Sequence, residues 1–522
     1  MIRADTLVKD PPAMSHDLLI IGAGSAGCAI ASRASEDPNR TVLLLEAGPD
    51  YPDIAQTPFD LVNSHNNSYT DHDWGFKYEP VRGREIVFPR GRVTGGSSAV
   101  NTTIALRGVP EDYDEWAELG NTAWSWEKVL PAFKRLERDL DFGDRDYHGD
   151  AGPITIRRYP RDEMLPQHQA FLETARLLDY PDCADQNDPY GWGSGPQPMN
   201  KLGRLRISCA VGYLAPARIR PNLTIRANTF VRRLIIENGR CAGVEVEDAD
   251  GKSERLTAKT VVLCAGAIMS PAILMRSGIG PAEHLESLSI PVTRDVPGVG
   301  QNLGDHPALS VAAKVKDPSL LDPDQPIIQT ILRYTAPGSD KRNDLQIEQF
   351  SFSGRGGSGT FGIAAVLEYQ YGRGELRLRS ADPREDPIVD NRFCEDERDT
   401  ARLVACFKDA LAFTREGPLA EMIEELAFPD PSRSLDDDGI AALCRKLSGS
   451  GYHPCGTVKM GPANDAMAVV DQYGCCHSVD NLVVADASIM PFVPRANTNL
   501  TCIMIGEMVG EWLRTNPGRY GL

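Results

Sequence analysis

The feature that most constrains this 522-residue chain is a glycine-rich turn near its N-terminus. The apolar run "DLLII", Asp17 to Ile21, predicts a strand buried on both faces, and "SAGCAIASRASE" after the turn predicts a helix of small residues. A second apolar run, "TVLLLEAG", completes a pattern that spans about thirty residues. A strand, a helix and a parallel strand in this order form a βαβ unit, so the sequence predicts an α/β fold.

The glycines of this turn match the dinucleotide-binding pattern G-x-G-x-x-G. Gly22 permits the tight turn, Gly24 lets a diphosphate approach the backbone, and Gly27 lets the helix pack closely on the strand. The unpaired N–H groups at the helix N-terminus would face the phosphates. Glu46, at the end of the second strand, is an acceptor for the adenosine ribose hydroxyls. The motif predicts NAD or FAD without distinguishing them.

The later part of the chain favours FAD. The β-type runs between Asn222 and Asp248, with turn signals at Asn238-Gly239 and Asp250-Gly251, predict a meander. After it, "KTVVLCAGA" predicts a buried strand that returns to the first sheet. A meander before a returning strand is typical of two-dinucleotide flavoproteins. A last buried strand, "VDNLVVADASIMP", and the helix after it predict that both chain ends build the nucleotide domain.

Size and composition limit the class of protein. A chain of 522 residues exceeds the usual limit for one hydrophobic core, so we expect two domains. The net charge of -18 argues against a nucleic-acid partner and against docking on anionic lipid. The N-terminal "MIRADTLVKDPPAMSHD" lacks the apolar stretch of a signal peptide, and no apolar run has the length of a membrane span. The 12 cysteines include no C-x-x-C pair, so we expect reduced thiols, no metal, and a cytoplasmic protein that acts on small molecules.

The pattern changes between Val311 and Leu447. There "YQYGRGELRLRSADP" alternates as a half-solvated strand does, and "ERDTARLVACFKDALAFTRE" has helical spacing of its apolar positions. This predicts a substrate-binding domain built on an antiparallel sheet with helices. We expect it to comprise residues 156–205 and 311–464, interleaved with a Rossmann-like FAD-binding domain of residues 14–155, 206–310 and 465–522.

Two longer stretches carry a family resemblance. "GRVTGGSSAVN", Gly91 to Asn101, and "GAIMSPAILMRSGIG", Gly266 to Gly280, resemble the signature segments of the glucose-methanol-choline (GMC) family of FAD-dependent alcohol oxidoreductases. The opening GAGSAG and the C-terminal "DASIMP" also match, so the likeness covers nearly the whole chain. Within the family, "DASIMPFVPRANTNLT" and the region "ERDLDFGD…HGDAGPI" look most like bacterial oxidases of aryl and furanic primary alcohols, such as 5-hydroxymethylfurfural; choline dehydrogenases come next.

The resemblance implies a set of cofactor contacts beside the glycine motif. Small residues and backbone N–H groups of the first signature let a flat ring and its diphosphate approach closely. Asp486 is expected to accept hydrogen bonds from ribityl hydroxyls or backbone N–H groups, with capping of the next turn as a compatible role. The start of the last helix is expected to place N–H groups at the flavin N1–C2=O edge. The predicted cofactor-binding residues are Gly22, Gly24, Gly27, Glu46, Gly91, Gly95, Gly96, Ser97, Asn101, Val231, Ala265, Asp486, Ala487, Asn499 and Thr501.

One position departs from part of the family. Some members attach FAD covalently through a histidine where this chain has Val100. Valine has no nucleophile, so we expect FAD to be bound non-covalently and Val100 to line the substrate pocket.

The stretch "SGYHPCGTVKMG" holds the expected catalytic centre, because the resemblance maps the catalytic histidine to His453 and the second active-site residue to Asn497. Alcohol oxidation removes a hydroxyl proton and a carbinol hydride, so the site needs a base and a hydrogen-bond partner for the oxygen. Asn497 cannot titrate, which leaves His453 as the base. The alternatives are a metal at His453 and Cys455, disfavoured because no other ligand pair lies nearby, and a structural histidine. Tyr452 is expected to line the pocket or to pack in the core.

The sequence therefore predicts that the chain oxidises a primary alcohol to the aldehyde, with proton abstraction by His453 and hydride transfer to flavin N5. Oxygen and a quinone or protein carrier remain open as electron acceptors, and the oligomeric state remains open. A cationic, choline-type substrate would suit so acidic a chain. A flavin-containing lyase or decarboxylase on the same fold is the alternative from another reaction class.

Overall fold

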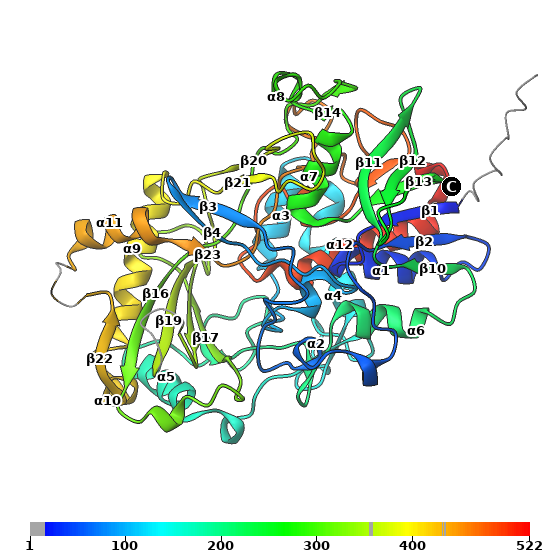
Figure 1. Cartoon of the computed structure of the whole chain (residues 1–522). Helices are drawn as coiled ribbons and strands as arrows, with labels where there is room; N and C mark the ends of the chain where they lie inside the picture. Colours follow the sequence, from blue (N-terminus) through cyan, green and yellow to red (C-terminus); the bar gives the residue numbers. More distant parts are fainter. Residues whose placement is uncertain (1–15, 354–358, 431, 433–434) are drawn as a thin grey trace, which may run out of the picture.

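The computed structural model describes residues 16–353, 359–430, 432 and 435–522. Residues 1–15 lie outside the described residues. They include most of the N-terminal segment to which the signal-peptide prediction applies, and residues 14 and 15 of the predicted FAD domain. Figure 1 shows two bodies side by side, each organised around its own sheet. No helix within the described ranges has both the length and the apolar character needed to cross a membrane.

The first body contains a parallel sheet of apolar strands. Its parallel strands run in the order β10 (Leu223–Arg226), β2 (Val42–Leu45), β1 (His16–Ile21), β13 (Ser253–Leu263) and β24 (Leu482–Val484). Ile20 lies between Leu44 and Val262, and all three side chains are buried, as expected for strands covered on both faces. The predicted α/β class is confirmed.

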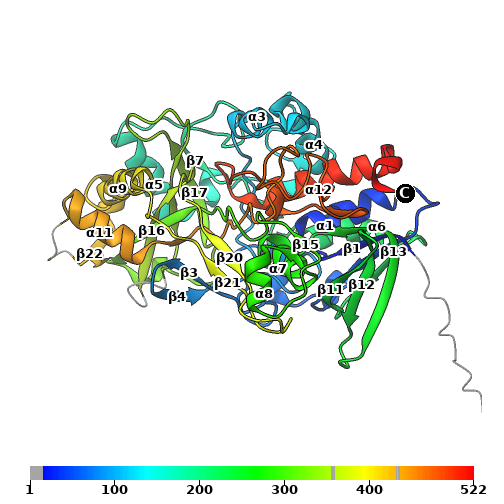
Figure 2. The same cartoon turned by 90° about the horizontal axis from the view of Figure 1, so that it is seen from above.

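Two helices from opposite ends of the chain pack on each other against this sheet. They are α1 (Ser25–Ala34) and α12 (Thr498–Thr515), which lie side by side in both views (Figures 1 and 2). The close approach depends on Gly506, where a Cβ would lie 2.6 Å from the Ala26 carbonyl oxygen. This pair brings segments from both ends of the chain into one body.

The predicted meander forms with two differences. β11 (Phe230–Glu237) and β12 (Arg240–Glu247) pair as a hairpin whose turn residues, Asn238 and Gly239, both have positive φ. β13 starts earlier than expected, because its first residues pair antiparallel with β12 before the rest pairs parallel with β1. β10 leaves the meander and pairs with β2, which buries Leu223 beside the parallel strands.

The second body contains an antiparallel sheet in the order β22 (Ile423–Phe428), β16 (Pro307–Val315), β19 (Thr360–Leu367), β18 (Leu345–Phe350), β17 (Ile328–Tyr334) and β7 (Gly193–Pro196). Helix α9 (Glu397–Ala412) packs on β16, β18 and β19. Because β16 begins at Pro307, residues 307–310 belong to this sheet and not to the body in which the sequence placed them. The short strand β23 (Gly449–Ser450) pairs with the start of β16 and leads into the His453 segment.

The segment "YQYGRGELRLRSADP", expected to form a long strand, forms only a short one. Only β20 (Glu375–Arg377) forms, in a separate small sheet with β21 (Ile388–Asp390), β3 (Lys77–Val81) and β4 (Arg84–Val87). Gly374 brings two backbones together here, since a Cβ at this position would lie 2.0 Å from the Asp390 carbonyl oxygen. The remaining elements are α2 (Phe59–Val62), α3 (Pro110–Glu118), α4 (Trp126–Leu136), α5 (Pro166–Leu177), α6 (Ala215–Ala217), α7 (Gly266–Arg276), α8 (Ala282–Ser287), α10 (Gly417–Glu421), α11 (Asp437–Leu447), β5 (Glu137–Asp139), β6 (Ile154–Ile156), β8 (Lys201–Leu202), β9 (Leu205–Arg206), β14 (Ile279–Gly280) and β15 (Arg294–Asp295).

Candidate active site

The first of two adjoining cavities lies at the carboxyl ends of the parallel strands and encloses ≈ 1110 Å³, including its opening to solvent. In an open parallel sheet this edge is the usual place for a ligand. The predicted cofactor residues that line it are Gly22, Gly24, Glu46, Gly91, Gly96, Ser97, Val231, Ala265, Asp486 and Ala487. We call this space the dinucleotide cavity.

The glycine turns leave room for a ligand against the backbone. A Cβ at Gly24 would meet no atom within 4 Å, whereas one at Gly96 would lie 2.6 Å from the Gly24 Cα. Gly27 lies beneath the turn, where a Cβ would come 2.0 Å from the Gly22 carbonyl oxygen. The open backbone at Gly24, at the positive N-terminus of α1, fits the diphosphate of FAD.

Glu46 holds this turn in place. Its Oε2 accepts a hydrogen bond from the Ala23 N–H, and its Oε1 accepts one from the Gly48 N–H, both at 2.9 Å. Burial raises the pKa of the carboxyl to about 7. Glu46 therefore fixes the loop and also lines the cavity where an adenosine ribose is expected.

Asp486 joins two elements at the other end of the dinucleotide cavity. Its Oδ2 accepts hydrogen bonds from the Gly266 N–H at 2.8 Å and the Ser270 hydroxyl at 2.5 Å. Its Oδ1 accepts one from the Ser488 N–H at 2.8 Å and so caps the turn after β24. The capping role predicted for Asp486 is present, and it anchors the N-terminus of α7.

Four predicted cofactor residues lie off the wall of the dinucleotide cavity besides Gly27. Gly95 supports the signature turn with a φ of 98°, and Asn101 and Asn499 line the second cavity. Asn499 Oδ1 accepts a hydrogen bond from the Ser25 hydroxyl at 2.9 Å, so it links the starts of α1 and α12. Thr501 lines neither cavity, because its hydroxyl lies inside the fold, 3.0 Å from Tyr113 Oη.

The second cavity encloses ≈ 1840 Å³, including its opening to solvent, and we call it the substrate cavity. His453, Asn497, Tyr452 and Val100 all line it, as the sequence predicts for substrate-side residues. It shares wall residues with the dinucleotide cavity, namely Ser25, Arg90, Ser97, Tyr452, Thr498 and Cys502. A ligand in either cavity therefore lies beside the other cavity.

Tyr452 occupies a strained backbone position on this shared wall. Its φ is 68°, which a non-glycine residue adopts only at a cost. The ring packs against Phe88 and Tyr69 at centroid distances of 6.3 and 6.2 Å. Of the two roles expected for Tyr452, lining the pocket is the one that the structure displays.

The ring of His453 lies between two polar neighbours. Its Nε2 is 3.1 Å from the amide Nδ2 of Asn497, which only donates, so Nε2 accepts. Its Nδ1 is 2.9 Å from Nδ1 of His306, so His453 donates its Nδ1–H and the His306 nitrogen accepts. The lone pair of His453 thus lies at Nε2, next to Asn497.

Asp305 organises this histidine pair from behind. Its Oδ1 accepts hydrogen bonds from the backbone N–H groups of His453 and His306 at 2.9 and 2.7 Å. Its Oδ2 accepts one from the Ser450 hydroxyl at 2.5 Å. Burial lowers the pKa of His453 well below its usual range, and the neighbouring His306 ring and Arg90 guanidinium lower it further. His453 is therefore a neutral imidazole at pH 7, the form that can accept a proton.

Sequence reasoning missed the residues that support His453. Asp305 lies 148 positions away in the chain, so no local spacing could reveal the contact. The segment "NLGDHP", which carries Asp305 and His306, is recognisable only as a family motif. Its role becomes visible once β16 and β23 bring Pro307 opposite Ser450.

Comparison with known proteins gives the identity of the fold. Sequence profiles described as GMC oxidoreductase match residues 16–308 and 370–506. The chain belongs to the GMC oxidoreductase family. It is 35% identical to an oxygen-dependent choline dehydrogenase of Chromohalobacter salexigens, with 96% of this chain and 95% of that protein covered. It is also 35% identical to a 5-(hydroxymethyl)furfural oxidase of Methylovorus sp., with 96% and 98% covered.

A solved GMC-type structure matches over almost its whole length. The crystal structure of pyridoxine 4-oxidase from Mesorbium loti superposes with a TM-score of 0.87 at 30% identity, covering 96% of this chain and 99% of that chain. The present chain is accordingly an oxidoreductase that acts on CH–OH donors, and it has the Rossmann-type FAD domain of the GMC family. The predicted family, fold class and reaction class are confirmed.

Proposed function

We propose that this GMC oxidoreductase oxidises a primary alcohol to the aldehyde, with non-covalent FAD as cofactor and His453 as the base. The observation that carries the proposal is the position of His453, whose Nε2 lies 3.1 Å from the Asn497 amide nitrogen in a cavity that shares a wall with the dinucleotide cavity. Alcohol oxidation requires this combination of base, oxygen-binding group and adjacent electron acceptor.

The residues divide the work as follows. The alcohol hydroxyl takes the place of the Asn497 N–H at His453 Nε2, so Nε2 accepts the hydroxyl proton. Asn497 Nδ2 then donates its hydrogen bond to the alcohol oxygen, on which negative charge builds. Asn497 Oδ1, which is buried without a partner among the described residues, is free to accept a hydrogen bond from the substrate. When bound, FAD supplies the hydride acceptor. Asp305 keeps the backbone of His453 in place throughout.

The domain assignment forms part of the proposal. The FAD-binding domain comprises residues 16–155, 206–306 and 465–522, and the substrate-binding domain comprises residues 156–205 and 307–464, with His453 between them. The shared cavity wall supports this division, because the first body supplies Ser25 and Ser97 and the second supplies Tyr452.

An anaerobic panel of primary alcohols tests the reaction class. A substrate alcohol should bleach the flavin absorbance without oxygen, whereas a lyase or decarboxylase would turn over with the flavin still oxidised. Matched tertiary alcohols have no transferable hydride and serve as controls. Admission of air then separates an oxidase, which reoxidises rapidly, from an enzyme that needs a quinone or protein carrier.

The mode of FAD attachment has its own test. Val100 is 4% exposed, lines the substrate cavity and carries no nucleophile. Acid denaturation should therefore release all of the yellow flavin into the supernatant. Flavin that stays in the protein pellet would contradict non-covalent binding.

A further inference from the structure

One wall of the substrate cavity is a face of the antiparallel sheet. Strand β18 alternates across this sheet, so Gln346, Glu348 and Phe350 share one face. Ser310 and Glu348 both lie opposite Ala364 of β19, one from each side. Both line the substrate cavity, on a wall whose other residues from β16, β18 and β19 are Ala308, Phe350, Gly362, Ala364 and Val366.

Glu348 has unused hydrogen-bonding capacity. Its Oε1 accepts a hydrogen bond from Gln346 Nε2 at 2.8 Å, and its Oε2 has no partner among the described residues. The side chain lines the cavity although the residue is only 7% exposed. Burial raises the pKa of this carboxyl to about 7. Because Glu348 lines the cavity, a carboxylate oxygen without a protein donor can accept a hydrogen bond from a molecule bound there.

The charges around the cavity select a neutral donor over a cation. Arg84 and Arg90 line the same cavity as Glu348, and Arg90 Nε and Nη2 have no partner among the described residues. A cationic ligand would meet these guanidinium groups, whereas a hydroxyl group would not be repelled. Aromatic rings on the wall provide faces for the body of the ligand, from Tyr69, Tyr78, Phe350, Phe352 and Tyr452.

We propose that Glu348 is a specificity-determining residue that binds a second, neutral hydroxyl group of the substrate. The substrate is then an aromatic or cyclic alcohol with one hydroxyl at His453 and another at the sheet wall. This inference rests on the proposed function, which assigns the reacting hydroxyl to His453 and Asn497.

The test compares two alcohols that differ by one hydroxyl group, 1,4-benzenedimethanol and 4-methylbenzyl alcohol. Anaerobic stopped-flow measurements on the holoenzyme give the rate constant for flavin reduction divided by Kd. We expect this quantity to favour the diol by about tenfold or more, beyond the factor of about two for its equivalent carbinols. Glu348→Leu should remove the extra preference, and Glu348→Gln should keep part of it, because its amide oxygen still accepts. Glu424→Gln, exposed on β22 of the same sheet, is the control.

A binding measurement separates this inference from the proposed function. Calorimetry on the dithionite-reduced enzyme, which cannot oxidise either alcohol, should show the same preference for the diol and its loss in Glu348→Leu. Equal affinity for the two alcohols, failure of the diol to bind, or a preference unchanged in Glu348→Leu would overturn the role of Glu348. The role of Glu348 would also be overturned if the enzyme bound 4-(aminomethyl)benzyl alcohol more tightly than the diol and Glu348→Leu abolished that preference. That result would show that the carboxylate binds a cation. If no alcohol bleaches the flavin but the calorimetric preference depends on Glu348, the proposed function fails and this inference stands.

Discussion

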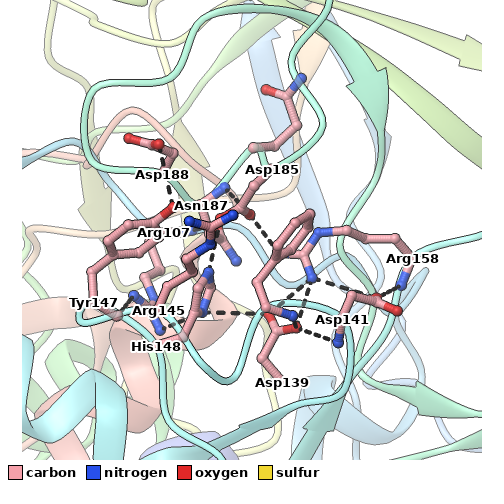
Figure 3. Close-up of polar contacts among 12 residues, drawn as sticks. Arg107, Asp139, Asp141, Arg145, Tyr147, His148, Arg158, Asp185, Asn187 and Asp188 are labelled. Carbon is pink, nitrogen blue, oxygen red and sulfur yellow. Dashed lines mark hydrogen bonds and ion pairs between the residues drawn. The ribbon is translucent and has the colours of Figure 1, made fainter.

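His453 and His148 are both buried, and their pKa values shift in opposite directions. Burial lowers the pKa of His453, and the nearby ring of His306 adds to the effect. Burial also acts to lower the pKa of His148, but hydrogen bonds to Asp185 and Glu137 outweigh it and the pKa is raised. Figure 3 shows the His148 ring within a network of polar side chains that includes Asp185. Its Nε2 lies 2.9 Å from Asp185 Oδ2, and its Nδ1 lies 2.7 Å from Glu137 Oε1. The comparison shows that the hydrogen-bond partners of a buried histidine can reverse the effect of burial on its pKa.

The His148 cluster pairs acidic with basic side chains. The carboxylates of Glu137, Asp139 and Asp185 face the guanidinium groups of Arg107 and Arg158, and Asp141 lies 3.5 Å from Arg158. Arg107 pairs with Glu137, and Arg158 lies 2.8 Å from Asp139 and 2.6 Å from Asp185. Glu137, Asp139 and His148 offer ligand atoms within 4.8 Å of one another, but the arginines already neutralise these carboxylates. The cluster therefore acts as a clamp that ties β5 and two loops to Arg107.

The largest effect is expected from breaking this clamp. Glu137→Gln removes one carboxylate and leaves Arg107 and His148 buried with unbalanced charge. The free energy of unfolding should fall by about 3–5 kcal/mol, measured by urea denaturation of the holoenzyme. The flavin-reduction rate per bound flavin should stay close to that of the unaltered protein. Stability that is unchanged would show that the cluster is solvated in solution.

The next effect tests the other histidine. His453→Ala removes the neutral base, so the rate of anaerobic flavin reduction by a substrate alcohol should fall by roughly 10² or more. Flavin content and thermal stability serve as controls for the fold. If reduction proceeds at the original rate, proton transfer must be assigned to another group.

The pH dependence of stability should follow His148. Because its pKa is raised by folding, the stabilisation is fully present below the unfolded pKa of about 6.5 and is lost as pH rises through the folded value. Asp185 acts at the other extreme, since its pKa is lowered to about 2 as the partners His148 and Arg158 outweigh burial, so its contribution is lost only as pH falls toward that value. His148→Gln should flatten the fall in melting temperature above pH 6.5. If the melting temperature of His148→Gln falls as much above pH 6.5 as that of the unaltered protein, a group other than His148 causes the pH dependence.

The smallest expected effect is the absence of a titration at His453. Its pKa lies well below the usual range, so the ring stays neutral across the neutral region. The rate constant for flavin reduction should change less than about threefold between pH 6 and 9. A steep loss of rate below pH 7 would show that a group with an ordinary histidine pKa controls the step.

The parallel sheet could be predicted from the sequence because the residues that form its first βαβ unit are close together in the chain. The run from β1 through α1 to β2 contains its own periodicity and its own glycine turn. The residue pair His453 and Asn497 could be predicted only through the family resemblance. Asp305 and its contact to His453 depend on the pairing of distant strands, which no spacing in the sequence encodes.

Glu348 and Glu137 illustrate why buried polar residues could not be predicted from the sequence. Glu348 lies in a strand that is buried on both faces. Such a strand does not alternate between apolar and polar residues, so the sequence does not show which way the carboxylate points. Glu137 belongs to the run "ERDLDFGD", which contributed only a family likeness and looks like an ordinary acidic surface. Its burial depends on Arg107 and on His148, which lie 30 and 11 positions away.

The wall common to the two cavities has a thermodynamic consequence. Arg90, Tyr452 and Cys502 line both the dinucleotide cavity and the substrate cavity. A ligand that orders these side chains in one cavity therefore also orders them for a ligand in the other cavity. Cofactor and alcohol affinities are then coupled, and the coupling is reciprocal: the factor by which FAD strengthens alcohol binding equals the factor by which alcohol strengthens retention of FAD.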